Sequence, residues 1–402
     1  MRDGWTRVAL GEVAQLDIDR VSVDPSVEYS VAGVLNAGQG LFEREPMPGS
    51  STNYPALHRL RAGQVVMRKL TAWEGPITVV PDRFDGYFAS PEFPTFTLDR
   101  SRVEPDFMKL VCARPELWGQ LRDLSTGSVQ RRKRVSPSRL LEVKLDLPPM
   151  SVQRRTVDLI DRIDTYALRA RTCWGAARSI RSALLDDLLF PRGDERWATT
   201  TVGDVVRLVK RGRAPAYADD GLVVLSQKCV REENTLELGA ARCTDADKRP
   251  IPDWAYVTVG DTLVASTGRG TLGRASYVAA LPFDATVDSH VTIVRPESEL
   301  VLPAYLGLVL SAMRSELEAY GSGSTNQTEL SREAISSISI PLPPGSVQHD
   351  IVNLIDAFDS AIRPISSIVE ALTSVRSSML DELLSGEREI PPSYDELVGL
   401  VM

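Results

Sequence analysis

The sequence lacks the features that define several common classes of protein. Its four cysteines, Cys112, Cys173, Cys229 and Cys243, form no CxxC pair, so neither a zinc site nor a disulfide framework is expected. No apolar run approaches the roughly 20 residues that a membrane-spanning helix needs. The first residues also lack the apolar stretch of a signal peptide. We therefore expect a cytoplasmic protein that does not interact with membranes.

Catalytic signatures are scarce as well. The three histidines, His58, His290 and His349, are far apart and no HExxH motif is present, so each is expected to be a surface or core histidine rather than a metal ligand. The nucleophile motif GxSxG and the phosphate-binding motif GxxxxGK[ST] are both missing. These observations favour a binding function over catalysis.

The charge balance needs more care. The net charge of −8 argues mildly against nucleic-acid binding as a property of the whole chain. However, DNA affinity depends on where the cations lie rather than on their total. Acidic residues gather near two predicted long helices and in residues 381–396, whereas basic residues are densest at 131–134.

The most informative feature present is a long internal repeat. The segment LPPMSVQ at residues 147–153 returns as LPPGSVQ at 342–348, an offset of 342 − 147 = 195 residues. Each copy opens a predicted long helix that closes on similar words, LLDDLL at 184–189 and MLDELL at 379–384. This period is far longer than the roughly 20–50 residues of a solenoid unit. The sequence therefore predicts a duplicated unit of one domain followed by one helix.

The two predicted helices carry the same apolar pattern, here called the helix seam. Its positions advance by alternating steps of three and four, which is the period of a left-handed coiled coil. Nearly all positions are apolar in both helices, and the exception is arginine in both, Arg181 and Arg376. A polar seam residue costs stability but can fix register. The seam residues are Ile160, Ile163, Ala167, Ala170, Trp174, Ala177, Arg181, Leu184 and Leu188 in the first helix, and Ile355, Phe358, Ile362, Ile365, Val369, Leu372, Arg376, Met379 and Leu383 in the second.

Pro364 interrupts the pattern of the second helix. Its ring removes a backbone hydrogen bond and clashes with the preceding turn. We therefore expect a kink or break near Arg363.

Short β-like runs with Gly and Pro punctuation precede each helix. Residues 64–67 and 261–265 each follow a glycine and are expected to be equivalent strands, as are 77–80 and 275–278. Helical stretches are expected at 105–121 and 303–317. The predicted fold class is α+β, with two similar domains joined by two long antiparallel helices that form a coiled coil. The predicted domains are 1–150 and 193–344, the helices 151–192 and 345–386, and an acidic tail 387–402.

Three motifs resemble catalytic or cofactor sites. Residues 268–273 match GxGxxG, but the residues that follow are strand-like rather than helical, so a glycine-rich turn between strands is expected. Asp106, Glu142 and Lys144 loosely match the PD-(D/E)xK nuclease pattern, in which carboxylates hold Mg²⁺ and a lysine stabilises charge. The positions in the second half that match Glu142 and Lys144 are Ser337 and Ser339. Residues 390–394 resemble a methyltransferase Pro-Pro-Tyr turn without its leading Asn or Asp, in a tail with no domain around it.

Clusters of cations beside hydroxyl and amide groups remain as candidates for binding. Arginine can read guanine, Gln or Asn can read adenine, and lysines and hydroxyls hold phosphates. Each cluster alone would more often be a solvated face. The candidate DNA-binding residues are Arg68, Lys69, Ser128, Gln130, Arg131, Arg132, Lys133 and Arg134 in the first half, and Lys210, Arg211, Arg213, Gln227, Lys228, Arg269, Arg274, Ser324, Asn326 and Gln327 in the second.

Taken together, the repeated Leu-Pro-Pro…Gln turn, the helix ending in Leu-Leu-Asp-Asp-Leu-Leu and the two-fold layout resemble the specificity subunit of Type I restriction–modification enzymes. The resemblance extends from about Trp5 to Gly386. It implies two target recognition domains that each read one half of a split double-stranded DNA sequence, and two helices that set the distance between them.

The resemblance also implies partners. Two methyltransferase (modification) subunits carrying S-adenosylmethionine would dock largely on the helices, and restriction (translocase) subunits using ATP and Mg²⁺ would join where restriction activity exists. The chain itself would hold no cofactor, metal or catalytic residue. The alternatives are a PD-(D/E)xK nuclease that uses Asp106, Glu142 and Lys144, and a coiled-coil assembly protein that does not bind DNA.

Overall fold

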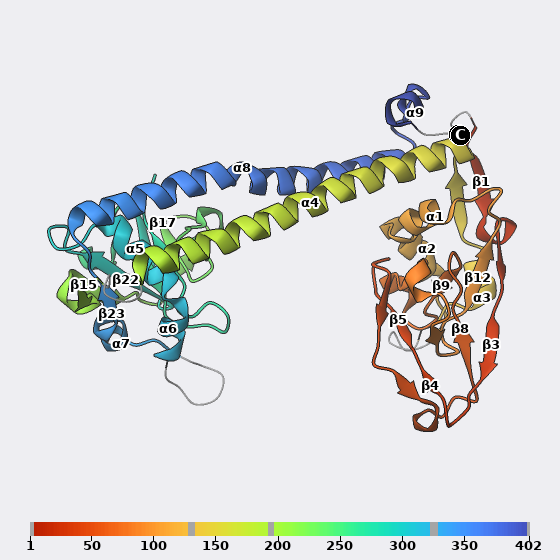
Figure 1. Cartoon of the computed structure of the whole chain (residues 1–402), viewed down its shortest axis with the longest axis horizontal. Coiled ribbons are helices and arrows are strands. Elements are labelled where there is room, and N and C mark those ends of the chain that lie inside the picture. The colour runs from red at the N-terminus through yellow and green to blue at the C-terminus, as the bar shows by residue number, and fades with distance from the viewer. Residues whose placement is uncertain (1–3, 128–132, 192–196, 322–328, 400–402) are drawn as a thin grey trace. The chain divides into compact units, whose positions relative to one another are not determined.

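The computed structural model describes residues 4–127, 133–191, 197–321 and 329–399. Its contacts divide the chain into two units, residues 1–169 with 369–402 (unit 1) and residues 170–368 (unit 2). Each unit holds one globule and part of each of two long helices, α4 (Met150–Leu189) and α8 (Gly345–Leu384) (Figure 1). The division runs through both helices. The domain limits proposed from the sequence stay predictions.

The globule of unit 1 is built on a four-stranded antiparallel sheet in the order β10-β9-β12-β2, beside a three-stranded sheet β11-β8-β3. Smaller pairs are β1-β13, β4-β7 and β5-β6. The elements are β1 (Thr6–Ala9), β2 (Ala14–Leu16), β3 (Asp19–Ser22), β4 (Glu28–Tyr29), β5 (Ala32–Val34), β6 (Leu41–Glu43), β7 (Met47–Pro48), β8 (Ala56–Arg59), β9 (Val65–Met67), β10 (Ile77–Val79), β11 (Phe88–Ala89), β12 (Thr95–Leu98), α1 (Pro105–Cys112), α2 (Pro115–Leu124), α3 (Pro137–Leu140) and β13 (Lys144–Leu147).

The globule of unit 2 repeats this frame. Its sheet β15-β22-β19-β20 matches the four-stranded sheet of unit 1 read in reverse, and β14-β23 matches β1-β13. A second sheet, β16-β18-β17-β21, includes the parallel pair β17 and β21. The elements are β14 (Thr199–Thr201), β15 (Val206–Arg211), β16 (Tyr217–Ala218), β17 (Leu222–Leu225), β18 (Arg242–Thr244), β19 (Thr262–Ala265), β20 (Ala275–Tyr277), β21 (Ala285–Val287), β22 (Val291–Pro296), α5 (Pro303–Ala312), α6 (Arg314–Ala319), α7 (Arg332–Ser337) and β23 (Ser339–Pro341).

The strand predictions are confirmed. β9 and β19 occupy the two predicted equivalent runs, and β10 and β20 occupy the next two. All residues of β9 and β19 are buried, which explains their continuous apolar sequence rather than an alternating one. The preceding Gly63 and Gly260 have φ of +80° and +99°, a left-handed backbone that favours glycine.

Each predicted helical stretch is two helices rather than one. The first divides into α1 and α2, with Pro115 at the first position of α2. Proline is favoured at that position, because its missing N–H would be unpaired there, and it disfavours helical backbone in the residue before it. The second divides into α5 and α6 at Met313.

Within each unit, segments of α4 and α8 lie antiparallel (Figure 1). In unit 1, Ile160 and Ile163 share the main hydrophobic core with Leu380 and Leu383. In unit 2, Leu185 and Leu189 share a core with Ile351, Val352 and Ile355. Every seam residue named from the sequence is buried or half-buried, so the seam is the face that both helices turn away from solvent.

The two seam arginines form reciprocal ion pairs. In unit 2, Arg181 donates from Nε and Nη2 to Asp359 at 2.5 and 2.8 Å. In unit 1, Arg376 donates from the same atoms to Asp164 at 2.5 and 3.0 Å. Both arginines and both aspartates are related by the 195-residue offset. The repeat therefore carries a donor and an acceptor in each copy, and each donor meets the acceptor of the other copy.

The repeated glutamine of the Leu-Pro-Pro…Gln segment fixes each helix to its globule. Buried Gln153 donates from Nε2 to the carbonyls of Pro148 and Arg102, both at 2.9 Å, and accepts from Glu104 N at 2.9 Å. Gln348 likewise donates to Pro343 O at 2.9 Å and accepts from Leu302 N at 2.8 Å. The motif therefore satisfies backbone groups that burial at the helix start would otherwise leave unpaired.

α8 runs without interruption through Pro364, so the helix does not break there, and the alternative of a kink stays a prediction. Both Pro364 and Ser360, whose carbonyl loses its helical donor there, are exposed to solvent. Water can hydrogen-bond that carbonyl, so the missing bond costs less than it would in a core.

The segment after α8 packs on its own unit, whereas the sequence suggested a tail with no domain around it. Ile390 is part of the core of unit 1, and Tyr394 packs against that core. A short helix, α9 (Ser393–Val398), places Asp395 against Arg155 of α4, with Nε–Oδ1 and Nη2–Oδ2 distances of 2.8 and 2.6 Å. The Arg155 guanidinium lowers the pKa of Asp395.

We expect Asp395→Asn to release α9 from α4 without unfolding unit 1. The substitution removes the charge that pairs with Arg155. Hydrogen exchange of residues 390–399 should become faster, while exchange in β9 and β12 should not change. Because the folded pKa of Asp395 is lowered, docking of the native segment should weaken as the pH falls below the usual value of 3.8. Unchanged protection of residues 390–399 in the variant would contradict this role.

Candidate nucleic-acid interface

Four candidate residues of the first half lie close together in unit 1, namely Arg68, Lys69, Lys133 and Arg134. Lys69 and Arg134 flank Glu92, with nitrogen–oxygen distances of 3.7 and 3.6 Å. Backbone hydrogen bonds also join the segment around Lys69 to the segment around Arg134. Val135 N donates to Lys69 O, and Thr71 N donates to Lys133 O. Glu92 was not foreseen, because it is distant in sequence from both cations.

Arg68 is held by its surroundings. Its Nη2 donates to Asn36, Thr71 and Glu74 at 3.0, 2.7 and 3.1 Å, and its Nε donates to Leu70 O at 3.0 Å. These bonds occupy Nε and Nη2, so of the five N–H groups only the two on Nη1 remain for a base or a phosphate. Arg68 is therefore better suited to shaping this surface than to contacting a ligand.

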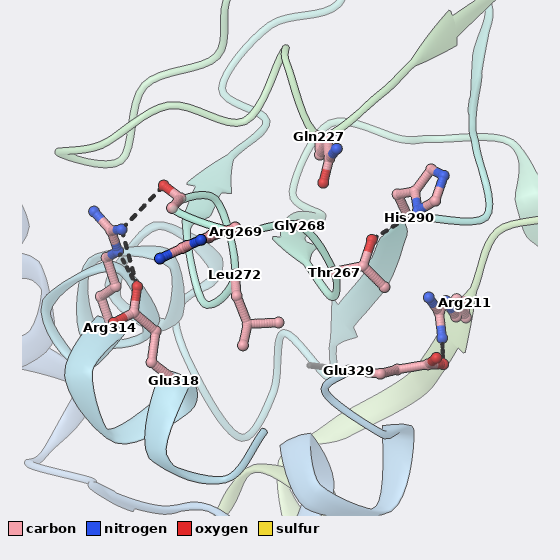
Figure 2. Close-up of a pocket in the computed structure, with 11 residues that line it drawn as sticks. Arg211, Gln227, Thr267, Gly268, Arg269, Leu272, His290, Arg314, Glu318 and Glu329 are labelled. Atoms are coloured by element: carbon pink, nitrogen blue, oxygen red, sulfur yellow. Dashed lines mark hydrogen bonds and ion pairs between the residues drawn. The ribbon is translucent and has the colours of Figure 1, made fainter. Parts of the chain in front are cut away.

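In unit 2, three of the candidates line one cavity of about 880 Å³ (Figure 2). These are Arg211, Gln227 and Arg269. The cavity is lined by both cationic and anionic side chains and by the glycine-rich turn after β19. Its lining comprises Arg211, Gln227, Thr267, Gly268, Arg269, Gly270, Leu272, His290, Arg314, Glu318 and Glu329.

Two polar contacts fix one side of this cavity (Figure 2). Arg211 forms an ion pair with Glu329 and donates to Ser289 O at 2.5 Å, and burial lowers its pKa. Thr267 Oγ1 lies 2.6 Å from His290 Nδ1 (Figure 2). Because the Arg211 guanidinium is already paired, it is better suited to holding the cavity wall in place than to donating hydrogen bonds to a ligand. His290 carried no sequence signal, since nothing near it in the chain marks a site.

Residues 268–273 form a turn between β19 and β20, as predicted, and no helix begins there. Thr271 Oγ1 donates to Gln227 Oε1 at 3.0 Å. A Cβ on Gly268 would lie 2.3 Å from that oxygen, and φ of Gly268 is +99°. Glycine is therefore required for Gln227 to approach the turn, and the contact leaves the Gln227 amide N–H₂ group available as a donor.

The two arginines of this turn differ. Arg269 is exposed at the cavity and, within the described part of the chain, makes no hydrogen bond or ion pair. Arg274 is half-buried and lies 3.4 Å from Glu232. Arg269 is thus the better candidate for a ligand contact, and Arg274 is better suited to a structural role.

Lys210 and Arg213 lie over the ring of Trp254, with distances of 4.9 and 5.8 Å to its centroid. Arg242 stacks on Tyr217 in the same unit, 3.5 Å from the ring centroid. An aromatic ring beneath an arginine fixes the orientation of its flat guanidinium group. A guanidinium held in this way can stack on a base. Neither aromatic residue was predicted, because the pairing partners are separated in sequence by turns and strands.

Lys228 is exposed beside the cavity residue Gln227, and its backbone N–H donates to Ser226 Oγ at 3.2 Å. The remaining candidates fall outside the described residues. They are Ser128, Gln130, Arg131 and Arg132 in the first half, and Ser324, Asn326 and Gln327 in the second.

The nuclease alternative requires carboxylates that converge on a metal. Asp106 lines a cavity of unit 1 with Glu104, Asp158 and other side chains, but Glu142 and Lys144 are not part of its lining. Over the described residues, no cluster of three or more His, Cys, Asp or Glu side chains could hold a metal ion. In the same residues, no helix is both long and apolar enough to cross a membrane.

Comparison with known proteins gives a family match for the second half of the chain. Residues 194–373 match the family model of the Type I restriction modification DNA specificity domain. A putative type I restriction enzyme MjaX specificity subunit from Methanocaldococcus jannaschii is 18% identical over 196 residues, which cover 48% of this chain and 46% of that protein. The chain thus matches about half the length of this relative.

Two solved structures share the fold over nearly the whole chain. One comes from work on complex assembly and conformational transition of the type I R-M system, with a TM-score of 0.62 and 18% identity over 96% of this chain and 98% of that one. The other is the Type-I restriction-modification system S subunit from M. genitalium, with a TM-score of 0.55 and 13% identity over 94% and 96%. The resemblance noted in the sequence is confirmed: residues 194–373 match the Type I restriction modification DNA specificity domain, and the chain is similar in fold to these solved structures.

Proposed function

We propose that the chain is the DNA sequence-recognition subunit of a Type I restriction–modification complex. The observation that carries this proposal is the repeated frame, in which each globule is clamped to a long helix and bears its own cluster of cations. A protein that contacts two separate stretches of DNA needs two reading surfaces and a spacer. Each α-helix of 40 residues extends about 60 Å, longer than the roughly 34 Å of one DNA turn.

The two reading surfaces differ, so we infer an asymmetric target. In unit 1 the candidates surround Glu92, whereas in unit 2 they line a cavity with an exposed arginine and an amide. Different side chains present different patterns of donors and acceptors to the major groove. The proposed target therefore has two unlike half-sites separated by a gap that the protein does not read.

We further propose that this chain is not itself catalytic. Methyl transfer would come from two modification subunits that carry S-adenosylmethionine, and DNA translocation or cleavage from restriction subunits that use ATP and Mg²⁺. Large apolar side chains that are exposed on the two helices, including Tyr166, Ile180, Ile368 and Val375, offer surface for such subunits. Exposed apolar patches commonly mark protein interfaces.

Single-molecule methylation sequencing tests this proposal. Cells that produce the chain together with its modification subunits should carry methylated adenines within one split motif, and deletion of this chain alone should remove that methylation. The same motif methylated with and without the chain would rule out the proposed function. A coiled-coil assembly protein would also leave the motif unchanged, and its complex would show no salt-sensitive DNA binding.

Replacing Arg269 with alanine should relax one base position in one half-site. An arginine that donates to a guanine contributes about 1–3 kcal/mol of discrimination. Binding to a library of half-site variants, measured with the assembled complex, should show the loss at that position. The matched control is Lys228→Ala, which should weaken binding to all sequences alike. It should also reduce by about 1 the slope of the logarithm of the binding constant against the logarithm of the salt concentration. Equal losses at every base position for Arg269→Ala would exclude direct reading.

A further inference from the structure

A strained turn of unit 2 lies between helix α4 and the candidate cavity. Glu233 and Asn234 both have φ of +60°, in the left-handed region that residues with side chains rarely adopt. Thr235 N donates to Glu232 O, and Arg231 N to Thr235 O, which closes a tight hairpin turn. Strain of this kind persists only where the surroundings enforce it, and it gathers at functional positions.

The surroundings that enforce this turn are specific. Asn234 Oδ1 accepts a hydrogen bond from Tyr277 N of β20 at 2.8 Å. Ser276 Oγ, also of β20, donates to Thr235 O. The turn is therefore fixed on the strand that follows the glycine-rich turn of the cavity.

Three arginines from three separate segments of unit 2 converge on the carboxylate of Glu232. Its Oε1 lies 2.6 Å from Arg314 Nη1 of α6 and 3.4 Å from Arg274 Nη2, and its Oε2 lies 3.4 Å from Arg178 Nη2 of α4. Glu233 adds an ion pair with the same Arg178. One acidic turn thus connects the helix to two arginines of the globule.

The connection continues into the cavity wall. Arg314 Nη2 donates to Gly270 O at 3.2 Å (Figure 2), in the glycine-rich turn that also carries Arg269. The path from α4 to the cavity therefore runs from Arg178 through Glu232 and Arg314 to Gly270. A charged network of this kind orients the groups that it joins.

Stability alone does not account for this arrangement. The side chains of Glu232 and Arg178 are 44% and 43% exposed, so this ion pair, which links the turn to α4, contributes little to folding. The stability that this ion pair contributes therefore does not explain the strained backbone of the turn. The turn does, however, fix the position of the cavity wall relative to α4.

We infer that Glu232 is a positioning residue that holds the glycine-rich turn of the cavity in a fixed place relative to α4. This inference rests on the proposed function, in which the helices set the separation of two half-sites. Its consequence is that the Glu232 network sharpens the choice of gap length between the half-sites, without contacting a base.

The test uses the assembled complex and three DNA duplexes that carry the correct half-sites with the native gap, one base pair fewer or one more. The native complex should prefer its own gap by about tenfold or more, equivalent to about 1.4 kcal/mol. Glu232→Gln should bind the native gap nearly as well but lose most of the preference. Arg178→Gln, on the other side of the contact, should do the same. The matched control is Glu333→Gln, which removes one exposed ion pair with Arg332 and should keep the full preference.

The outcomes separate the two proposals. A native complex that binds none of the duplexes would refute the proposed function. A native complex with a gap preference that both Glu232→Gln and Arg178→Gln retain would overturn the positioning role alone. Hydrogen exchange of residues 268–273 in the free chain gives a second readout. It should become faster in Glu232→Gln than in Glu333→Gln, and equal exchange would contradict the inference.

Discussion

Replacing Arg181 with alanine is expected to lower the free energy of unfolding by about 2–3 kcal/mol. The side chain of Arg181 is only 6% exposed, and its ion pair with Asp359 lies on the helix seam. Removal of the arginine leaves the carboxylate of Asp359, itself 31% exposed, beside apolar surface without its partner. Because Asp359 keeps some contact with water, the expected loss is below the 3–5 kcal/mol of a fully buried pair. Urea unfolding followed by circular dichroism measures it.

The repeat supplies the control for this prediction. Arg376 and Asp164 form the equivalent pair in unit 1, but their side chains are 36% and 45% exposed. Arg376→Ala should therefore cost less than about 1 kcal/mol. The exchange Arg181→Asp with Asp359→Arg should recover part of the loss of either single change. Equal losses for Arg181→Ala and Arg376→Ala would show that burial does not set the strength of these pairs.

The second large effect is expected from Gln153→Leu. Gln153 is fully buried and makes three hydrogen bonds to backbone groups at the start of α4. Leucine would leave Glu104 N unpaired and remove the donor from two carbonyls, and each buried unsatisfied group costs about 1–3 kcal/mol. We expect a loss of about 3 kcal/mol or more in the free energy of unfolding.

Calorimetry should show this loss as a lower melting temperature of unit 1, with unit 2 little affected. The exposed Gln39 is a suitable control, and Gln39→Leu should change stability by less than about 0.5 kcal/mol. Gln348→Leu should instead destabilise unit 2. A melting temperature of unit 1 that Gln153→Leu leaves unchanged would show that the repeated glutamine has no clamping role.

The sequence predicted the helices well because their periodicity is local and occurs twice. Steps of three and four identify the buried face of each helix without any knowledge of its partner. The same reasoning missed Asp164 and Asp359, because each lies one residue beyond a seam position and only the antiparallel register brings it to an arginine. It also overestimated the disruption that Pro364 causes in α8, because the cost of a proline depends on whether the freed carbonyl can hydrogen-bond to water.

The candidate interface was predictable only in part. Runs of cations indicate where a charged surface lies, but not which side chains are already paired. Arg68 and Arg211 proved to be held by neighbours, whereas Arg269 is exposed. His290, Trp254 and Glu232 reach the site through contacts between segments that are far apart in sequence. Such contacts arise from the tertiary fold and leave no local pattern to read.

Base-interference footprinting of the assembled complex on its own target tests the central claim most directly. If two unlike surfaces are held apart by the paired helices, modified bases should block binding in two separate patches of different sequence. The bases of the gap between them should be tolerated. A single continuous patch, or binding that no base modification affects, would contradict an account in which each globule reads its own half-site.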